Sequence, residues 1–557
     1  MKPLREADPN LLFNLKQYLD EELYQYAEEK LEEFWQLCMT EIDKRAVHTD
    51  REGQPRLIKY DRFGNDISEV WVNEGYKKTV EQTYQTGIVG YVHKEIPELG
   101  RKGNYVYSYA QGYLLSQVEP GFYCPVTLTM ATAYLLEHFA DEELKKKYLP
   151  HVISTGELEL YEGATFLTER QGGSDVGANE VKAVPFGDHY KIYGEKYFAS
   201  NAGMCGVATV LARIEGSQPG TKGLSLFLVP WRNKDGTLNG IQIRRLKDKL
   251  GVRAVPSAEV VFDGAKAYLL GDAKKGFYYM MEALNLSRVC NAVASIGMMK
   301  RAFDEAKQYA YYRSAFGNPL ASYPMVKETL ANLAARQEVQ TSACFALISF
   351  FDRVMNEPES ASEKEKAWNR LLIALLKMRT AEEAISFAHE AIEMHGGNGY
   401  IEDFVTPRLL RDAQVLTVWE GTANILGLEV LRLIRKFNVH ETFIQSMNDE
   451  LNKLSNHVRS FAAPVEKGLK ELVSFLQKLE RQPEDMQTYH AKRIANRMCD
   501  IYLSIIALKD AQSGGERKEI IARLFLQHIW NKEAIDEEML PLKYFDLLMN
   551  EKNKLSV

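Results

Sequence analysis

The stretch VLTVWEGTANIL, Val415 to Leu426, places one carboxylate, Glu420, in an otherwise apolar and small-residue run. One interpretation makes Glu420 an acid that opens a helix, because the next segment has apolar residues at helical spacing and a helix dipole favours a negative charge before the first turn. The other makes Glu420 a general base, since partial desolvation makes a carboxylate more basic. This stretch alone favours the helix-opening interpretation, and the choice depends on the rest of the chain.

Two further stretches combine hydroxyl groups with glycine or an aromatic ring. In TFLTERQGGSDVGANEVKA, the hydroxyls of Thr168 and Ser174 flank the turn Gly172–Gly173, whose backbone amides can approach a ligand closely. In GEKYFASNAGMCGVATVLAR, Phe198 and Ser200 alternate along an incoming strand. Each stretch also has a purely structural interpretation, as a glycine-rich turn and as an ordinary strand.

Arginine and glycine residues end two expected helices. In YYRSAFGNPL, Arg313 follows a helix and either caps its C-terminus or offers a rigid fork to a pyrophosphate. In EMHGGNGYIED, the run from Gly396 to Gly399 ends a long helix and exposes backbone N–H groups. That run suits either a helix stop or a bound phosphate.

The elements that position these residues follow from the periodicity of the chain. Residues 1 to 155 have mostly helical spacing, and residues 161–270 contain short β-branched runs separated by turn residues. Helical spacing then returns, and a further helical section follows residue 437. The expected long helices are 276–313, 323–355, 362–395 and 424–437. Helices, then strands, then helices indicate segregated α and β domains and argue against βαβ winding.

Composition narrows the function classes. The chain of 557 residues is long enough for two to four structural units, and its net charge of −7 does not indicate a nucleic-acid binder. No apolar run approaches the length of a transmembrane helix, and the charged N-terminal stretch resembles neither a secretory signal nor a transit peptide. Six scattered cysteines without a CxxC pair indicate a reducing compartment, so we expect a cytoplasmic protein.

Other site classes lack the required spacing. His389 and His395 are six residues apart and therefore do not share a helix face, and no Cys/His cluster has metal-ligand spacing. No GxGxxG motif follows an expected strand. We therefore expect neither a metal site nor a Rossmann-type dinucleotide site.

Together, the four stretches resemble the flavin-dependent acyl-CoA dehydrogenase family. LTERQGGSD is similar to its signature loop, KLGVRAVPSAEVVFDGA and LLGDAKKGF to its strand pair before the C-terminal helices, and WEGTANI to the loop that bears the catalytic acid. YYRSAFGNPL and HGGNGYIED resemble its cofactor-contacting helix segments. EPGFYCPVTLTMA, TERQGGSDV and the additional C-terminal helices resemble the alkylation-response (AidB-like) branch.

The resemblance implies a multi-domain α+β fold with four parts. These are an N-terminal helical domain (1–160), a β-barrel-like domain (161–275), a C-terminal helical bundle with FAD and the catalytic base (276–437) and a helical extension (438–557).

The resemblance also implies the cofactor contacts. Thr168 would hydrogen-bond the isoalloxazine, Phe198 would pack against the flavin where the family commonly has Trp, and Ser200 stands where a Thr approaches N5. Glu393 departs from a common Gln, and an acid there would repel a pyrophosphate. The implied FAD contacts are Leu167, Thr168, Gly173, Ser174, Phe198, Ser200, Arg313, Phe316, Gly396, Gly397, Thr422 and Asn424, with Arg313, Phe316 and the glycines partly reaching a neighbouring subunit's cofactor.

For the reaction, the resemblance identifies Glu420 as the base. It would accept the C2 proton of an acyl-CoA thioester while a hydride leaves C3 for flavin N5, giving the trans-2-enoyl-CoA. Ser174, Arg288 and Gly421 would contact the substrate, and no acid precedes Arg288 where some relatives carry the base. The resemblance further implies a role in fatty acid metabolism and an electron-transfer flavoprotein as the electron acceptor. It also implies a homodimer or homotetramer.

Two alternatives stay open. One is an acyl-CoA oxidase on the same fold, and the other is a DNA-binding flavoprotein of the alkylation response. DNA binding needs a basic face, but residues 437–557 hold 17 Lys and Arg against 18 Asp and Glu, with HAKRIANR as the local basic cluster. We therefore expect no nucleic-acid partner. The acyl chain itself is not predicted.

Overall fold

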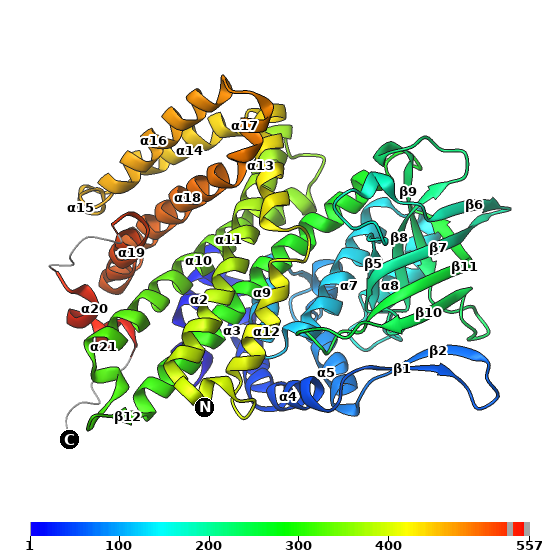
Figure 1. Cartoon of the computed structure of the whole chain (residues 1–557), viewed down its shortest axis with the longest axis horizontal. Helices are drawn as coiled ribbons and strands as arrows, with labels where there is room; N and C mark the ends of the chain where they lie inside the picture. Colours follow the sequence, from blue (N-terminus) through cyan, green and yellow to red (C-terminus); the bar gives the residue numbers. More distant parts are fainter. Residues whose placement is uncertain (1, 532–537, 551–557) are drawn as a thin grey trace. The chain divides into compact units, whose positions relative to one another are not determined.

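The computed structural model describes residues 2–531 and 538–550 of the chain (Figure 1). Two compact units can be distinguished. The first, Glu33–Cys290, is called the sheet unit, and the second, Met1–Glu32 together with Asn291–Val557, is called the helical unit. The predicted mixture of helices and strands is confirmed, while the division into four domains stays a prediction.

The sheet unit begins with the end of α3 (Glu21–Leu37) and a set of helices. These helices are α4 (Asp43–Arg51), α5 (Glu74–Gln85), α6 (Tyr105–Ser116), α7 (Pro120–Phe139) and α8 (Glu142–Val152). Side chains of Asn73, Asn104 and Asp141 cap the N-termini of α5, α6 and α8 by accepting a backbone N–H three residues on. Two hairpins interrupt this region. One pairs β1 (Arg56–Tyr60) with β2 (Asp66–Trp71), and the other pairs β3 (Glu95–Ile96) with β4 (Arg101–Lys102). The sequence analysis did not predict either hairpin.

The main sheet closes into a ring. Its strands are β5 (Gly163–Phe166), β6 (Lys182–Phe186), β7 (His189–Ser200), β8 (Val207–Ile214), β9 (Leu224–Pro230), β10 (Ile241–Leu246) and β11 (Ser257–Leu269). β11 pairs with β7, β7 with β6, β6 with β8, β8 with β9, and β9 again with β11, while β10 and β5 extend β11 and β8. Ring closure satisfies strand edges that would otherwise be free. This arrangement confirms the predicted barrel-like β region.

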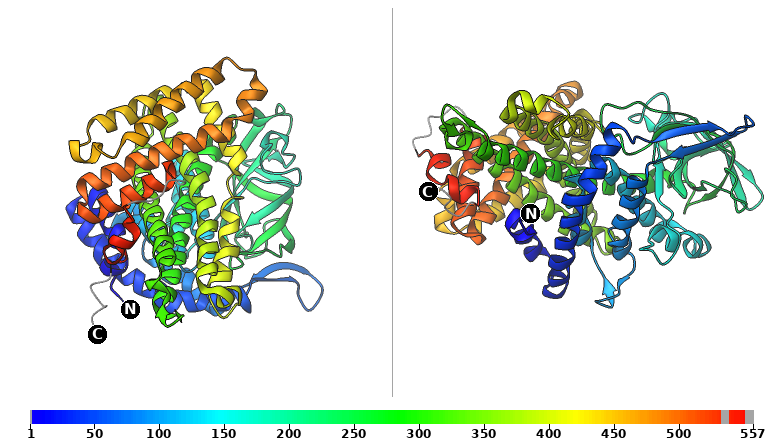
Figure 2. Two further views of the ribbon diagram at one scale, coloured as in Figure 1. Left: turned by 60° about the vertical axis from the view of Figure 1, so that its left-hand side comes forward. Right: turned by 90° about the horizontal axis from the view of Figure 1, so that it is seen from below.

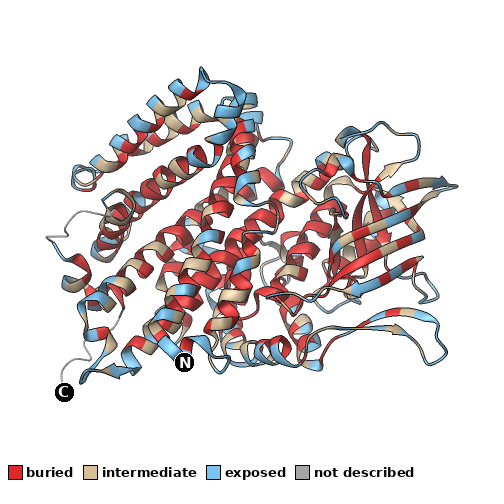
Figure 3. Cartoon of the chain, in the orientation of Figure 1, coloured by how far each residue is buried: buried red, intermediate tan, exposed pale blue. Residues whose placement is uncertain are grey.

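Burial alternates along the strands as a half-buried sheet requires. In β10, Ile241 and Ile243 are buried while Gln242 and Arg244 are exposed. Figure 3 shows buried and exposed positions along the strands of the sheet. The sequence pattern IQIRRL therefore sets which face of this strand packs inward.

The helical unit is built from long helices. They are α2 (Pro9–Tyr18), α9 (Gly276–Tyr312, entering from the sheet unit), α10 (Pro324–Asn356), α11 (Glu363–His395), α12 (Thr406–Leu416) and α13 (Ala423–Phe437). α9, α10, α11 and α13 agree with the predicted helices to within one residue at each end. α11 starts at a capping box made by Ser362 and Glu365 and stops at Gly396, whose φ of +60° suits glycine. Short elements, α1 (Leu4–Ala7), β12 (Ser314–Ala315) and β13 (Asn318–Pro319), complete this part.

The C-terminal extension is helical, as predicted. It consists of α14 (Val439–Asn452), α15 (Asn456–Arg459), α16 (Ala463–Glu480), α17 (Glu484–Tyr489), α18 (Ala491–Ser513), α19 (Gly515–Trp530), α20 (Leu540–Lys543) and α21 (Phe545–Leu548). α18 packs against α10, α11 and α13 as well as against α14, α16 and α19 (Figures 1 and 2). The extension is therefore part of the same compact unit as α10, α11 and α13.

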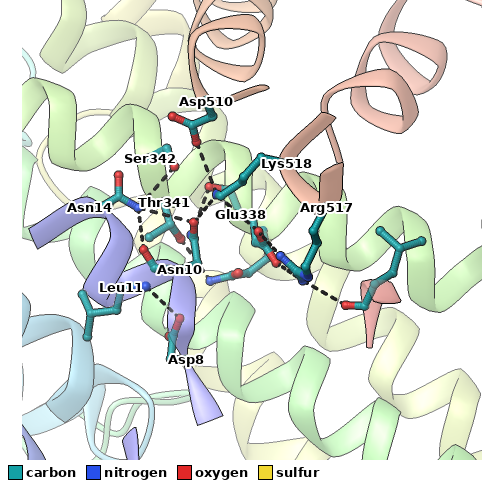
Figure 4. A network of polar contacts seen from close by, with 12 residues as sticks. Asp8, Asn10, Leu11, Asn14, Glu338, Thr341, Ser342, Asp510, Arg517 and Lys518 are labelled. Atoms are coloured by element: carbon teal, nitrogen blue, oxygen red, sulfur yellow. Dashed lines mark hydrogen bonds and ion pairs between the residues drawn. The ribbon is translucent and has the colours of Figure 1, made fainter. Parts of the chain in front are cut away.

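A buried polar network ties this unit together (Figure 4). Arg517 Nη1 donates to Glu338 Oε2 at 2.8 Å, and Lys518 Nζ lies 3.3 Å from the same oxygen. Lys518 also lies 3.3 Å from Asp510 Oδ2 and donates to Asn10 Oδ1, and Asn10 Nδ2 donates to the Glu338 carbonyl at 3.3 Å. The network thereby joins α2, α10, α18 and α19.

Charge pairing decides the ionisation of Glu338. Burial by itself raises the pKa of this carboxyl, but the positive charges of Arg517 and Lys518 outweigh burial and lower the pKa to about 2. Glu338 is therefore a carboxylate at all physiological pH values.

Candidate active site

The loop after β5 carries the first group of predicted residues. Gly172 has a φ of +114°, and its N–H donates to the Glu169 carbonyl at 3.0 Å, which makes the turn. A Cβ atom on Gly173 would lie 2.6 Å from Thr168 Oγ1. The absence of a side chain at Gly173 thus leaves room for the Thr168 hydroxyl, and the two predicted residues lie against each other.

A buried ion pair fastens this loop to β7. Lys196 Nζ donates to Glu169 Oε1 at 2.7 Å and to the Leu167 carbonyl at 3.1 Å, and the two charged side chains are 0% and 6% exposed. The Glu169 carboxylate also accepts the backbone N–H groups of Glu180 at 2.6 Å and Val181 at 3.3 Å. Burial lowers the pKa of Lys196 to about 8, although the charge of Glu169 opposes that change. Both carboxylate oxygens of Glu169 thus accept hydrogen bonds, and Lys196 on β7 also holds the Leu167 carbonyl.

Phe198 and Ser200 lie on β7 beside the loop. The Tyr197 N–H donates to the Thr168 carbonyl at 2.9 Å, which places the strand next to the turn. Phe198 is 54% exposed, although it is a large aromatic residue. Ser200 Oγ lies 3.3 Å from Ser257 Oγ on β11. The structure therefore brings the predicted loop and strand residues of the sheet unit together.

A lysine that the sequence analysis did not select lies at the Phe198 ring. Lys247 Nζ is 4.6 Å from the centroid of Phe198 and 3.3 Å from that of Tyr197, and it donates to Glu259 at 2.8 Å. This arrangement puts a cation on the face of two aromatic side chains.

The two remaining predicted residues of the sheet unit differ in exposure. Arg288 on α9 is buried, and its Nη1 lies 3.4 Å from Asn285 Oδ1. Ser174 is exposed at the end of the glycine turn.

Glu420, in the helical unit, stands outside the helix that follows it. The N-cap of α13 is Thr422, and the first turn of α13 contains no acidic residue. Glu420 has a φ of +55°, a left-handed conformation that a side chain with a Cβ rarely adopts. Its carboxylate Oε2 accepts a hydrogen bond from Asn291 Nδ2 at 3.1 Å. The carboxylate is therefore bound to α9, which does not match a simple helix-opening acid.

Two buried side chains hold the Glu420 loop. Asn291, 5% exposed on α9, also donates to the Leu416 carbonyl at 3.2 Å, and Lys377, 1% exposed on α11, donates to the Gly421 carbonyl at 2.7 Å. Strained backbone persists where its surroundings over-determine it. These contacts restrain the loop on both sides of Glu420. The predicted residue Asn424 lies beyond the loop, in the first turn of α13.

Arg313, Phe316, Gly396 and Gly397 form a second group in the helical unit. Tyr309, one turn before Arg313, stacks on His395 at 4.1 Å between centroids. Phe316 is 96% exposed with a φ of +51°, and a Cβ on either glycine would meet nothing within 4 Å. The group therefore presents an open surface at the ends of α9 and α11.

This second group lies far from Glu420 within the chain. Lys377 on α11, which contacts the Glu420 loop, and Gly396, which directly follows α11, are 19 positions apart, or about 28 Å at the rise of an α-helix. Arg313 likewise follows the end of α9, while Asn291 lies near its middle. The structure therefore does not bring the two predicted groups of the helical unit together in one chain.

Sequence reasoning missed Asn291, Lys377, Lys196 and Lys247. Asn291, Lys377 and Lys196 lie in helices or strands and Lys247 directly follows β10, and no spacing along the chain links any of them to its partner. Buried Lys is rare unless it is paired, so its burial becomes informative only in the structure.

Three family models match consecutive parts of the chain. The adaptive response protein AidB N-terminal domain matches residues 6–156, the acyl-CoA dehydrogenase middle domain residues 164–265 and the acyl-CoA dehydrogenase C-terminal domain residues 274–434. Acyl-CoA dehydrogenase family member 11 of Caenorhabditis elegans is 32% identical over 487 residues, which cover 85% of this chain and 77% of the relative. The chain belongs to the acyl-CoA dehydrogenase family. Members of this family are FAD-dependent oxidoreductases.

The AidB-like resemblance is also confirmed. The putative acyl-CoA dehydrogenase AidB of Escherichia coli is 34% identical over 391 residues, covering 69% of each chain. The solved structure of Caenorhabditis elegans ACDH-11 in complex with C11-CoA superposes with a TM-score of 0.87 at 27% identity, covering 100% of this chain and 97% of that one. That structure therefore covers this chain along its whole length, including the C-terminal extension.

Within the described residues, no three His, Cys, Asp or Glu side chains form a group that could hold a metal ion. The same part of the chain contains no helix long and apolar enough to cross a membrane. None of the six cysteines, all within the described residues, forms a disulfide.

Proposed function

We propose that this acyl-CoA dehydrogenase converts an acyl-CoA thioester to the trans-2-enoyl-CoA, with Glu420 as the base that accepts the C2 proton. The observation that carries the proposal is the placement of Glu420: its carboxylate is held by Asn291 in a left-handed loop outside α13. A carboxylate that merely stabilised the helix would need neither the strain nor the contact with α9.

The donor set of the sheet-unit loop fits FAD. Thr168 offers a hydroxyl beside the open Gly172–Gly173 turn, and the exposed Phe198 ring offers an aromatic face to a flavin. Thr422 and Asn424 add polar side chains at the start of α13, where a helix N-terminus favours an anionic group. When bound, FAD supplies the acceptor for the hydride that leaves C3.

The chain's own residues perform the proton transfer. Glu420 takes the C2 proton onto a carboxylate oxygen, and its backbone N–H donates to the thioester oxygen as enolate character develops. Gly421, with a φ of +106°, lets ligand and backbone approach closely, while Arg288 and Ser174 contact the thioester-bearing chain of CoA.

The proposal includes assembly and an electron acceptor. Arg313, Phe316, Gly396 and Gly397 are exposed and distant from Glu420, which supports their reaching the FAD of a neighbouring subunit in a homodimer or homotetramer. An electron-transfer flavoprotein would reoxidise the flavin. The protein would act in fatty acid metabolism in the cytoplasm, where its free cysteines stay reduced.

The test is an anaerobic reductive titration of the purified, yellow protein with acyl-CoA thioesters of different length and branching. Stoichiometric loss of the oxidised flavin absorbance with one class of thioester supports the proposal. A protein that takes up no FAD, or whose FAD no thioester reduces, contradicts it. Rapid reoxidation by air would favour the oxidase, and tight, salt-sensitive duplex binding lost on truncation after Phe437 would favour the DNA-binding alternative.

A further inference from the structure

Asn291 is the neutral donor that meets Glu420 from a different helix. Its Nδ2 lies 3.1 Å from Glu420 Oε2 and 3.2 Å from the Leu416 carbonyl, so one amide group contacts both the carboxylate and the last turn of α12. Asn291 is 5% exposed, and a buried side-chain amide needs hydrogen-bond partners. One partner is the Glu420 carboxylate, and the other is the carbonyl of the last residue of α12, just before the Glu420 loop.

The backbone of that loop is restrained mainly through side chains. Trp419 N–H closes the last turn before the base by donating to Val415, and regular helix bonds resume when Leu426 donates to Thr422. In between, Glu420 is in the left-handed region. The position of its carboxylate therefore depends on the side chains that reach into the loop, and Asn291 donates a hydrogen bond to Glu420 Oε2.

We propose that Asn291 is a positioning residue that holds the Glu420 carboxylate in the orientation needed for C2 proton removal. The inference rests on the proposed function of Glu420 as the base. Asn291 supplies a donor without a charge, so it orients the carboxylate and favours its ionised form less strongly than a cation would. Lys377 on α11 contacts the Gly421 carbonyl and stays in place in the variants below.

The main variant is Asn291→Leu, which keeps the size of the side chain and removes the donor. We expect flavin reduction by a good acyl-CoA substrate to slow about tenfold, because a displaced carboxylate misses the reacting geometry. We also expect the acid limb of the pH profile of flavin reduction to move up by about one pH unit, because the ionised form loses its hydrogen bond. Binding of the thioester should be unchanged.

Asn291→Asp is the second variant, and it has the shape of the original side chain. It places a like charge at the same distance from Glu420, so the acid limb should move further up than in Asn291→Leu. This variant keeps the inference testable if Asn291→Leu does not fold. The matched control is Ser295→Ala, one turn further along α9, which removes a buried hydroxyl bonded to the Asn291 carbonyl and should leave rate and pH profile unchanged.

The double variant Glu420→Gln/Asn291→Leu separates positioning from a general structural role. If Asn291 acts through Glu420, the double variant reduces its flavin at the rate of Glu420→Gln alone. An equal loss from Asn291→Leu in both backgrounds, or a single variant with wild-type rate and pH profile, overturns the inference. If Glu420→Gln itself reduces its flavin at the wild-type rate, the proposed function fails. That result can be told apart from the two outcomes that overturn only the role of Asn291.

Discussion

Glu338 and Glu420 are two carboxylates of the same helical unit, and their partners differ in charge. Glu338 receives hydrogen bonds from Arg517 and has Lys518 at 3.3 Å. Glu420 receives a hydrogen bond from the uncharged amide of Asn291, in a loop with strained backbone. Glu338 joins helices that belong to distant parts of the sequence, whereas Glu420 lies between two helices.

The charges of its partners decide the pKa of the buried Glu338. Two cations lower the pKa of Glu338 to about 2 even though burial acts in the opposite direction, so this carboxylate is a poor proton acceptor and a good structural link. A base must take up a proton near neutral pH, and a neutral donor orients a carboxylate with less loss of basicity. The two sites should therefore respond in opposite ways to the same substitution.

The largest expected effect is that of Glu420→Gln on the reaction. The substitution preserves shape and removes the base, so flavin reduction by a good acyl-CoA should fall by ~10²–10⁴. FAD content should be retained, and the free energy of unfolding should change by at most about 1 kcal/mol. Stopped-flow reduction and denaturant unfolding measure both quantities, and a near wild-type reduction rate would remove Glu420 from the mechanism.

Glu338→Gln should show the opposite pattern. Arg517 and Lys518 keep their charges but lose the carboxylate, and breaking a buried pair in this way costs about 3 kcal/mol, the low end of the range because Asp510 still faces Lys518. Urea unfolding should report the loss, while the reduction rate of the folded enzyme stays that of wild type. If the substitution slowed reduction as strongly as Glu420→Gln, the separation of structural and catalytic acids would be wrong.

Acid should weaken the same network without any substitution. The pKa of Glu338 is lower in the folded chain than its ordinary value of 4.5, so the folded state binds fewer protons there. Its contribution to stability is complete above pH 4.5 and is lost as the pH falls toward 2, amounting to about 3 kcal/mol by linkage. We expect the urea midpoint of Glu338→Gln to depend less on pH in this window than that of wild type, and parallel curves would contradict the assignment.

The smallest effect is expected at the third paired glutamate, Glu169. Lys196→Met removes its buried cation, but the carboxylate keeps two backbone N–H donors, so the loss should be about 1–3 kcal/mol. Because Lys196 also holds the Leu167 carbonyl, FAD affinity measured by calorimetry should fall together with stability. Lys191→Met on the same strand is the matched control, and equal FAD affinity in both variants would show that the ion pair does not hold the loop.

The sequence alone was enough for the long helices and for the strand-rich region that forms the main sheet. Helical spacing, a capping sequence such as that at Ser362 and a stop such as Gly396 are local features, and they set the ends of α11 without reference to the rest of the chain. The β1–β2 hairpin was missed because its strands are short and lie between strong helical segments. The ordered motifs also sufficed for the family, because several independent stretches point to the same chemistry.

Only the tertiary structure decided how the candidate base is held. Asn291 and Glu420 are 129 positions apart, and Lys518 and Asn10 are 508 positions apart, so no local pattern could pair them. Such contacts form because helices with matching apolar faces pack side by side, and a polar residue caught between them must find whichever partner the packing brings. The left-handed backbone of Glu420 has the same origin, since strain of this kind is sustained by surrounding contacts and is not encoded in the propensity of a glutamate.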